Sequence, residues 1–270
     1  MNVYDVVEAL PAPPLREYVR CYHYARVDLG DAVIRKPLTA RPEQMMQFNL
    51  AQPFAVVDRR SGAEASAPDV VIVGRQTRRN LDLRATGRLI TLTVHFQPTG
   101  FYRLFHVPLR HVTDLTPDAT DVVGVDVREV HERVVETPDD LWSMVAILER
   151  FLLTKVSDSR PLHPVQSAAR SMLHGSAPVG LGTMAAQSQI SVRQFERVFL
   201  EQVGVAPQMF GRIARFARAL QSKSDEPDRT WSEVVADAGY YDQMHFVRDC
   251  RAFGGDTPTA LMRTWIDCRP

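Results

Sequence analysis

Polar and apolar residues alternate over short stretches in the first 125 residues of the chain. Residues 89–96 place isoleucine, leucine, valine and phenylalanine on one face and leucine, threonine and histidine on the other. A period of two is typical of a β-strand with one buried face. Residues 45–50, 55–57 and 70–74 are further short strand candidates. Several short strands at this spacing predict an antiparallel barrel or sandwich.

From about residue 126, the apolar residues recur with the spacing of an α-helix. Apolar residues recur at positions 127, 130, 134 and 135, and again at 141, 144, 145, 148 and 152. This spacing predicts two helices, packed either on the barrel or on a second copy of the chain. Residues 157–164 are polar, contain two prolines and have the composition of an interdomain linker. The pattern after this linker is helical throughout.

The sequence therefore predicts an α+β protein of two domains. We expect one domain at residues 1–156, the linker at 157–164 and a second domain at 165–270. The first would be an antiparallel β-barrel with flanking helices. The second would be an all-α domain.

Composition indicates the class of the protein and the cellular compartment that suits it. The chain has 270 residues, 45% of them hydrophobic, and no apolar run of 18 residues, so we expect no membrane span. Its N-terminus lacks the basic and apolar layout of a signal peptide. The three cysteines, Cys21, Cys250 and Cys268, are far apart and form neither a disulfide framework nor a zinc motif. A reduced, cytoplasmic setting fits these features best.

A short pattern occurs twice in the last hundred residues. Its second copy repeats phenylalanine, arginine, glycine and proline 51 residues after the first, with one exception. The first copy comprises Phe195, Arg197, Phe199, Gly204 and Pro207, and the second comprises Phe246, Arg248, Cys250, Gly255 and Pro258. Two copies of one helical unit suggest two similar surfaces for an elongated, periodic partner such as double-helical DNA.

Each copy contains a short helix, a tight turn and a second helix. Ser191 and Asp242 are suited to cap the second helices, because their side chains can accept early backbone N–H groups. Gly239 suits the second turn, which is one residue longer than the first. A second helix with exposed Arg, Gln and His can enter the major groove, where Arg pairs with guanine and Gln with adenine.

The candidate DNA contacts are the outward residues of the two second helices and part of the helix that joins them. Residues 164–270 hold 12 Lys and Arg against 11 Asp and Glu, so binding would depend on locally placed arginines and not on bulk charge. The candidates are Arg193, Gln194, Glu196, Arg197, Gln243, Met244, His245 and Arg248, with Arg212 and Arg215 as possible phosphate contacts. Arg193 and Arg197 could instead form ion pairs on the helix surface, and Arg212, Arg215 and Arg218 a solvated helix face.

Residues 165–265 resemble the C-terminal DNA-binding domain of AraC/XylS-type bacterial transcription regulators. The resemblance implies that residues 165–270 form a DNA-binding domain with two helix-turn-helix motifs joined by a linker helix. The resemblance rests on four stretches at fixed offsets: Ser191, Arg193, Phe195, Arg197 and Phe199; Gly204 and Pro207; Gly239, Tyr240, Asp242, Gln243, His245 and Phe246; and Gly255 and Pro258. Three positions depart from the family pattern. Cys250 stands where the family usually has Phe, Gln189 where it often has Gly, and Val235 where it often has Ala.

The N-terminal part resembles, over fewer residues, the cupin-like sensor domains that precede such DNA-binding domains. The likeness is carried by residues 14–19 and 94–101. It implies a barrel that binds a small molecule or mediates dimerisation, without identifying the effector. The effector-site candidates are Arg41, Gln44, Phe48 and His95.

No metal, cofactor or catalytic site is predicted. Metal-binding cupins carry a His-x-His pair followed by an acid, whereas residues 95–97 supply one histidine. Cys21 and His23 are two residues apart on a strand, which is weak evidence for catalysis. We therefore expect a transcription regulator and not an enzyme. One alternative is a cupin-type enzyme with a non-catalytic helical domain. Another, suggested by the near-neutral charge of residues 164–270, is an interaction protein whose helical domain has lost DNA binding.

The expected partners follow from this function. They are operator DNA, an unknown small-molecule effector, a second copy of the chain in a homodimer, and RNA polymerase if the protein is an activator. The two second helices differ in their outward residues, so each monomer should bind an operator whose two half-sites differ in sequence.

Overall fold

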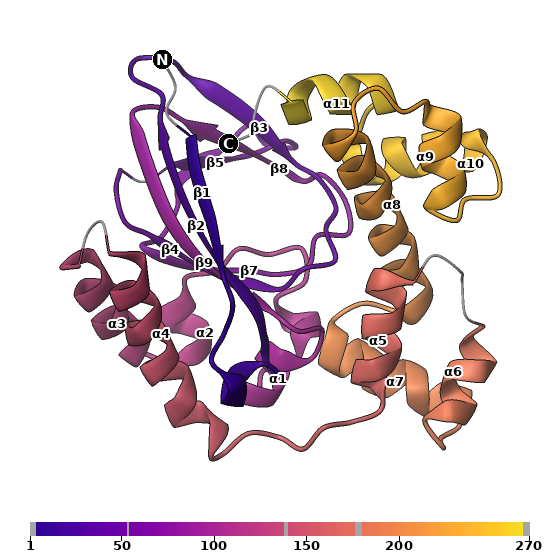
Figure 1. Ribbon diagram of the computed structural model, residues 1–270, viewed down its shortest axis with the longest axis horizontal. Coiled ribbons are helices and arrows are strands. Elements are labelled where there is room, and N and C mark those ends of the chain that lie inside the picture. Colours follow the sequence, from indigo (N-terminus) through magenta and orange to yellow (C-terminus); the bar gives the residue numbers. More distant parts are fainter. Residues whose placement is uncertain (1–3, 53, 138–139, 176–179, 267–270) are drawn as a thin grey trace.

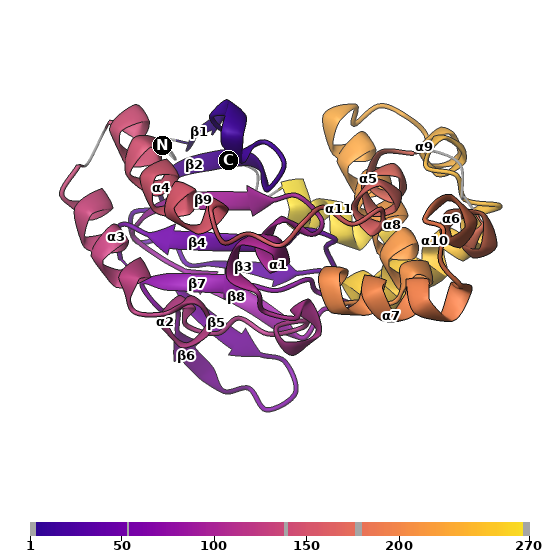
Figure 2. The same cartoon turned by 90° about the horizontal axis from the view of Figure 1, so that it is seen from below.

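A strand-rich N-terminal domain and a helical C-terminal domain lie side by side in the computed structural model (Figure 1). The structure describes residues 4–52, 54–137, 140–175 and 180–266. Turning the molecule by 90° keeps the two domains next to each other, with α11 and α5 at the boundary between them (Figure 2). None of the helices within these described ranges combines the length and apolar character needed to cross a membrane.

The N-terminal domain consists of two antiparallel sheets. The larger sheet has the order β1-β2-β9-β4-β7, and the smaller has the order β3-β8-β5-β6. The strands are β1 (Tyr4–Ala9), β2 (Val19–Asp28), β3 (Ile34–Leu38), β4 (Met45–Asn49), β5 (Ala55–Asp58), β6 (Glu64–Ser66), β7 (Val70–Val73), β8 (Leu81–Ala85) and β9 (Arg88–Phe96). Both sheets line one internal cavity, described below.

The four strands expected from alternation are confirmed as β4, β5, β7 and β9. The expected architecture of antiparallel strands is also confirmed, but the described strands pair into two separate sheets and not into one closed ring. β2 was not predicted although it pairs with both β1 and β9. Its register shifts between Val19 and Cys21, and this irregularity obscures the two-residue period.

Helices cover the outer face of the larger sheet. They are α1 (Gly100–Phe105), α2 (Ala119–Val123), α3 (Asp126–Val135) and α4 (Leu141–Val156), with short 3₁₀ turns η1 (Pro13–Leu15) and η2 (Leu109–His111). Most of the apolar positions predicted at residues 127–152 are buried in one core with the sheet, whereas Val135 is exposed. The two helices therefore cover the sheet, which is one of the two arrangements expected from the sequence.

The C-terminal domain is entirely helical where the structure describes it. Its elements are α5 (Val165–His174), α6 (Leu181–Gln187), α7 (Val192–Val203), α8 (Pro207–Asp225), α9 (Trp231–Asp237), α10 (Gln243–Asp249), the π-helical turn η3 (Cys250–Gly254) and α11 (Pro258–Ile266). We call α6 and α7 the first unit, and α9 and α10 the second unit. Each unit has its own apolar core, and α8 contributes side chains to both.

The sequence repeat corresponds to a structural repeat. Phe195 and Phe246 are completely buried, one in each core. Gly204 and Gly255 both adopt positive φ, +89° and +75°, at the end of α7 and of η3. Prolines begin the next helices, α8 and α11. Glycine and proline thus stop one helix and start the next in both units.

Candidate nucleic-acid interface

The second helix of the first unit, α7, presents a polar surface to solvent. Its N-cap is Ser191, whose hydroxyl accepts from the backbone N–H of Gln194 at 3.2 Å, as the sequence predicts. Phenylalanines 195 and 199 point into the core. The four predicted contact residues of this helix, Arg193, Gln194, Glu196 and Arg197, are all exposed. α7 therefore has one buried apolar side and one exposed polar side.

The equivalent helix of the second unit, α10, is built in the same way. Asp242 caps it by accepting from the backbone N–H of His245 at 2.7 Å. Its exposed residues are the predicted Gln243, Met244, His245 and Arg248, and the preceding Tyr241 is 91% exposed. The turn before α10 is one residue longer than that before α7, as expected.

The two turns use different residues in left-handed conformations. Gly239 has φ +79°, whereas Gln189 has φ +55° in the first turn. A side chain costs energy in this conformation, and Gln189 is one of the positions that depart from the AraC/XylS pattern. The first turn is therefore the more strained of the two.

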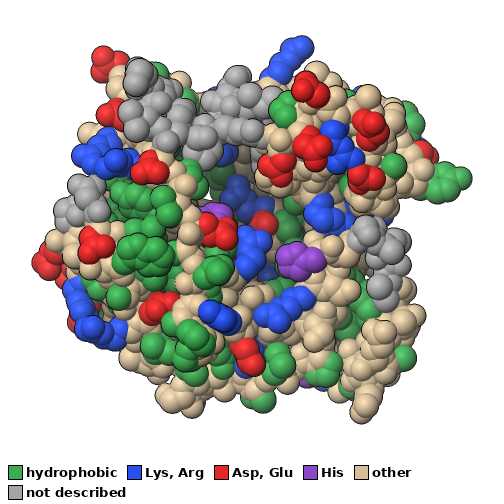
Figure 3. Space-filling view, in the orientation of Figure 1, with side chains coloured by type: hydrophobic (Ala, Val, Ile, Leu, Met, Phe, Trp, Pro, Cys, Tyr) green, Lys and Arg blue, Asp and Glu red, His purple; other side chains and the backbone are tan. Residues whose placement is uncertain are grey.

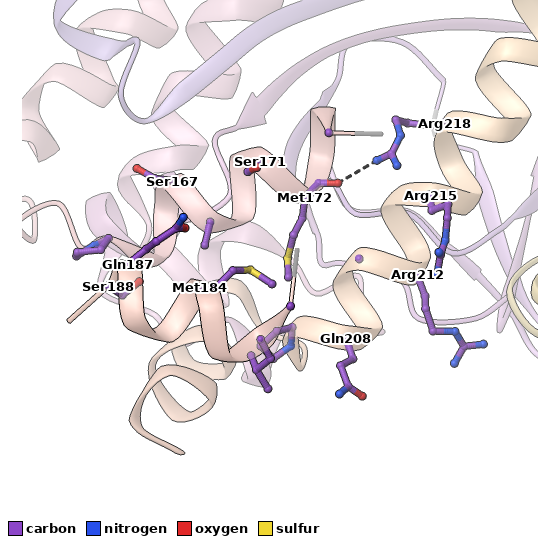
Figure 4. A pocket seen from close by; sticks show the side chains of 17 residues that line it. Ser167, Ser171, Met172, Met184, Gln187, Ser188, Gln208, Arg212, Arg215 and Arg218 are labelled. Carbon is purple, nitrogen blue, oxygen red and sulfur yellow. Dashed lines mark hydrogen bonds between the residues drawn. The ribbon is translucent and has the colours of Figure 1, made fainter. Parts of the chain in front are cut away.

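The arginines of α8 lie between the two units. Figure 4 shows Arg212 and Arg215 on one side of the helix, along a groove of about 710 Å³ that is also lined by α5 and α6. Arg212 donates to Asp249 at 2.6 Å, and Arg215 donates to the carbonyl of Gly239 at 3.1 Å. Arg218 turns towards α5 and donates to the carbonyl of Met172 at 2.9 Å.

These bonds show that the α8 arginines hold the helices of the domain together. They are not the purely solvated helix face that was one of the two interpretations of the sequence. Arg212 nevertheless keeps 45% of its side chain exposed. A phosphate contact by Arg212 or Arg215 remains a prediction.

The N-terminal domain contacts the end of the first unit through a buried arginine. Arg75, only 2% exposed, donates to the carbonyl of Val203 at the end of α7 at 2.6 Å. It also donates to Pro42 at 2.8 Å and Pro98 at 2.7 Å, both in the N-terminal domain. Its guanidinium lies 5.5 Å from the ring centre of Phe210. Burial lowers the pKa of Arg75 to about 9, so it stays charged at neutral pH.

Two hydroxyl groups extend this contact with the first unit. Thr113 donates to the carbonyl of Gly204 at 2.8 Å. Tyr102 donates to the carboxylate of Glu201, on α7, at 2.7 Å. Gly204 approaches so closely that a Cβ built on it would lie 2.7 Å from the Thr113 hydroxyl and 3.0 Å from the carbonyl carbon of Leu109.

The second unit contacts the same domain at nearly equivalent positions. The backbone N–H of Ala40 donates to the carbonyl of Phe253, in η3, at 2.9 Å. Gly255 lies beside Arg59, whose terminal nitrogen would be 3.0 Å from an added Cβ. Phe253 and Val203 differ by one position in the 51-residue repeat. The N-terminal domain thus contacts the first unit at the C-terminal end of α7 and the second unit just beyond the end of α10.

A cavity of about 390 Å³ lies between the two sheets of the N-terminal domain. Its walls are mainly apolar, and Arg41, Gln47, Gln76 and Thr116 are among its polar lining residues. Burial lowers the pKa of Arg41. Arg41 and Gln76 form an isolated β-bridge, with their backbone N–H···O bonds at 2.9 and 3.3 Å. Their chain neighbours, Arg75 and Ala40, are among the residues that contact the first and the second unit, respectively.

The four effector-site candidates lie in different positions relative to the cavity. Arg41 lines the cavity. Phe48 does not, because it points from the opposite face of its strand into the core under the helices. Gln44 is 1% exposed, and its amide has no hydrogen-bond partner among the described residues. Nδ1 of His95 accepts from the Arg20 guanidinium at 3.3 Å, outside the cavity lining. Burial, with help from His23 and nearby arginines, lowers the pKa of His95 to about 2 and keeps it neutral.

Arg75 and Gln76 were not predicted from the sequence. The one available signal was that a charged residue, Arg75, directly follows the apolar run 70–74, which ends in glycine. A buried arginine cannot be distinguished from a surface one on that evidence, because its acceptors, Pro42, Pro98 and Val203, are distant in the sequence.

Comparison with known families and structures gives two regional matches. A family model described as "Helix-turn-helix domain" matches residues 184–264. A second, described as "Domain of unknown function (DUF6597)", matches residues 7–118. No curated protein matches the chain.

Among solved structures, the chain is similar to ToxT from Vibrio cholerae. The 1.65 Å structure of ToxT has a TM-score of 0.50 at 9% identity and covers 90% of this chain and 97% of its own. The structure of wild-type ToxT from strain SCE256 with a bound unsaturated fatty acid has a TM-score of 0.51 at 11% identity, with coverages of 90% and 95%. At these identities the likeness establishes a shared two-domain fold alone.

Proposed function

We propose that this chain, a DNA-binding transcription regulator with an AraC-type helix-turn-helix domain, binds one operator through both α7 and α10. The observation that supports this most is the pair of capped, exposed helices, one in each unit of the repeat. α7 presents arginines, whereas α10 presents Gln243 and His245. Two recognition helices in one chain would occupy adjacent major-groove segments, ~34 Å apart along the duplex. A DNA-binding regulator of this kind acts in the cytoplasm, which is the location we propose.

A groove beside the first unit supports this geometry. It is lined by arginines of α8 on one side and by α5 and α6 on the other (Figure 4). A sugar-phosphate backbone separates two adjacent major-groove segments, and guanidinium groups are suited to phosphate. We propose that this backbone passes along the groove, with Arg212 as its nearest exposed contact.

We further propose that the cavity of the N-terminal domain binds the effector. Its size lies within the range of small-molecule sites, and its mainly apolar lining includes one basic residue, Arg41, and one acidic residue, Asp58. This combination suits a carboxylate with an apolar body, a class that includes the fatty acid bound to ToxT. The effector would act through Ala40 and Arg75, because each is bonded to one helix-turn-helix unit and adjoins a residue that lines the cavity.

Replacement of Arg193 by alanine is expected to lower affinity for the preferred operator by about 1–3 kcal/mol and to relax specificity at one base pair. The reason is that a guanidinium can pair with both acceptors of a guanine, which alanine cannot. A gel-shift titration on upstream DNA and on single-base variants measures both effects. Arg229→Ala is the control, because Arg229 pairs with Asp237 within the second unit. Equal losses on all sequences would contradict base recognition by Arg193.

Replacement of Arg41 by methionine is expected to weaken binding of octanoate about 10–100-fold, because one charge-assisted hydrogen bond contributes about 1.5–3 kcal/mol. Isothermal titration of the full chain measures this loss. Octanol is the matched ligand without a charge, and Arg84→Met is the matched surface variant, since Arg84 forms an exposed pair with Glu64. The proposed role of Arg41 fails if wild-type protein binds octanol as tightly as octanoate.

A further inference from the structure

Three residues with different metal-binding groups meet at the β1 edge of the larger sheet. Glu8 lies on β1, and Cys21 and His23 lie on β2. Glu8 is directly opposite His23 in the antiparallel register, and Cys21 shares a face of β2 with His23 because it is two residues away. One ligand atom from each of the three lies within 4.8 Å of the other two.

The backbone, and not a mobile loop, holds these groups together. The Glu8 carboxylate and His23 Nε2 are 2.7 Å apart. The Cys21 side chain is buried, whereas Glu8 and His23 keep 57% and 33% of their side chains exposed. An ion can therefore reach the group from solvent through Glu8 and His23 and meet the thiol beneath them.

We propose that Glu8, Cys21 and His23 form a binding site for a zinc ion. Thiolate sulfur, imidazole nitrogen and carboxylate oxygen are the three protein ligand types that Zn²⁺ prefers, at about 2.0–2.3 Å. Tetrahedral coordination at such lengths places the ligand atoms roughly 3.5 Å apart, so side-chain rotation must move the Glu8 carboxylate and His23 Nε2 apart from their present 2.7 Å. The thiolate makes the site unsuited to Mg²⁺ or Ca²⁺, which select oxygen ligands.

The surroundings leave the fourth coordination position open. His95 is the register partner of Cys21 on β9, and its ring centre is 4.3 Å from that of His23. Arg20 lies 3.3 Å from Nδ1 of His95, so this nitrogen accepts and the proton of the neutral ring is on Nε2. His95 therefore lies next to the proposed ion, but neither of its ring nitrogens has a free lone pair that could bind the ion. Water or an exchangeable small ligand would complete the coordination.

Figure 3 shows histidine, acidic and basic side chains together around the hollow in the middle of this face. The competing explanation of the cluster is an exposed Glu8–His23 ion pair beside an unrelated buried thiol. An exposed ion pair of this kind contributes little to stability and does not involve the sulfur. The two explanations differ in whether the Cys21 sulfur is a ligand, and this can be measured directly.

The experiment is a Co²⁺ titration of the full chain followed by absorption spectroscopy. Cobalt replaces zinc with the same ligands and gives a near-ultraviolet charge-transfer band only when a thiolate binds it. Cys268→Ser serves as the parent, because Cys268 lies outside the described residues and would add a third thiol. We expect the charge-transfer band in the parent, together with the visible bands of tetrahedral cobalt, and its displacement by Zn²⁺.

Variants assign the band to the site. Cys21→Ser should abolish it, whereas Cys250→Ser, which removes the other buried thiol, should keep it. Glu8→Gln changes an exposed residue and should lower zinc affinity about tenfold or more without changing thermal unfolding of the metal-free protein. Glu64→Gln, at an exposed pair on the other sheet, should have no effect. No charge-transfer band in the parent, or a band that survives Cys21→Ser, would overturn the proposal, as would equal zinc affinity of the parent and Glu8→Gln.

Discussion

Replacement of Arg75 by methionine is expected to lower the free energy of unfolding by about 3–5 kcal/mol. The guanidinium satisfies three buried carbonyl groups at once, those of Pro42, Pro98 and Val203. Methionine has a similar length but no donor, so all three acceptors lose their partner in a place that water does not reach. Urea denaturation of the full chain, followed by circular dichroism, measures the loss.

Arg84→Met is the matched control for this change. Arg84 pairs with Glu64 at 2.8 Å, but both side chains are nearly half exposed. Loss of such a pair costs about 0–1 kcal/mol. If Arg75→Met and Arg84→Met shift the urea midpoint equally, Arg75 does not hold the two domains together, and the proposed route from the cavity to α7 fails with it.

Replacement of Gly204 by alanine is expected to cost about 2–4 kcal/mol in the free energy of unfolding. Two effects add. The positive φ of +89° strains any side chain, and the new Cβ would lie 2.7 Å from the Thr113 hydroxyl and 3.0 Å from the backbone of Leu109. The first unit would have to move away from the N-terminal domain to accommodate the methyl group. Thermal unfolding by calorimetry measures the cost.

Gly62→Ala separates the two effects. Gly62 has a comparable φ of +73° but nothing within 4 Å of an added Cβ. It should therefore show only the conformational strain, of about 1–2 kcal/mol. The difference between the two variants measures the close contact between α7 and the N-terminal domain. Equal losses of unfolding free energy in the two variants would show that the added methyl group at residue 204 fits without weakening this contact.

Local sequence signals predicted the C-terminal domain well, because its structure depends on residues close in sequence. Ser191 and Asp242 cap the helices that follow them, and the buried phenylalanines repeat at helical spacing. The exposure of the candidate contact residues follows from the same periodicity. Which of them touch DNA is not determined by periodicity, and their roles remain proposals.

The N-terminal domain was less predictable, because its structure depends on distant pairings. The edge strand β1 was not expected at all, and the register between β1 and β2 brings Glu8 next to His23 from 15 residues away. The effector-site candidates show the same limit. Arg41 lines the cavity, but Phe48 faces the helices, since the assignment of faces depends on which neighbouring strands pair. Contacts between domains, such as Arg75 with Val203, leave no pattern in the sequence.

A hydroxyl-radical footprint of the wild-type protein on upstream DNA of its own gene tests the central claim most directly. We expect protection of two segments centred about 10 base pairs apart on one face of the duplex. Arg193→Ala should weaken protection of one segment, and Gln243→Ala should weaken protection of the other, because α7 and α10 would occupy different segments. Protection of a single segment, or loss of the same segment in both variants, would contradict the account.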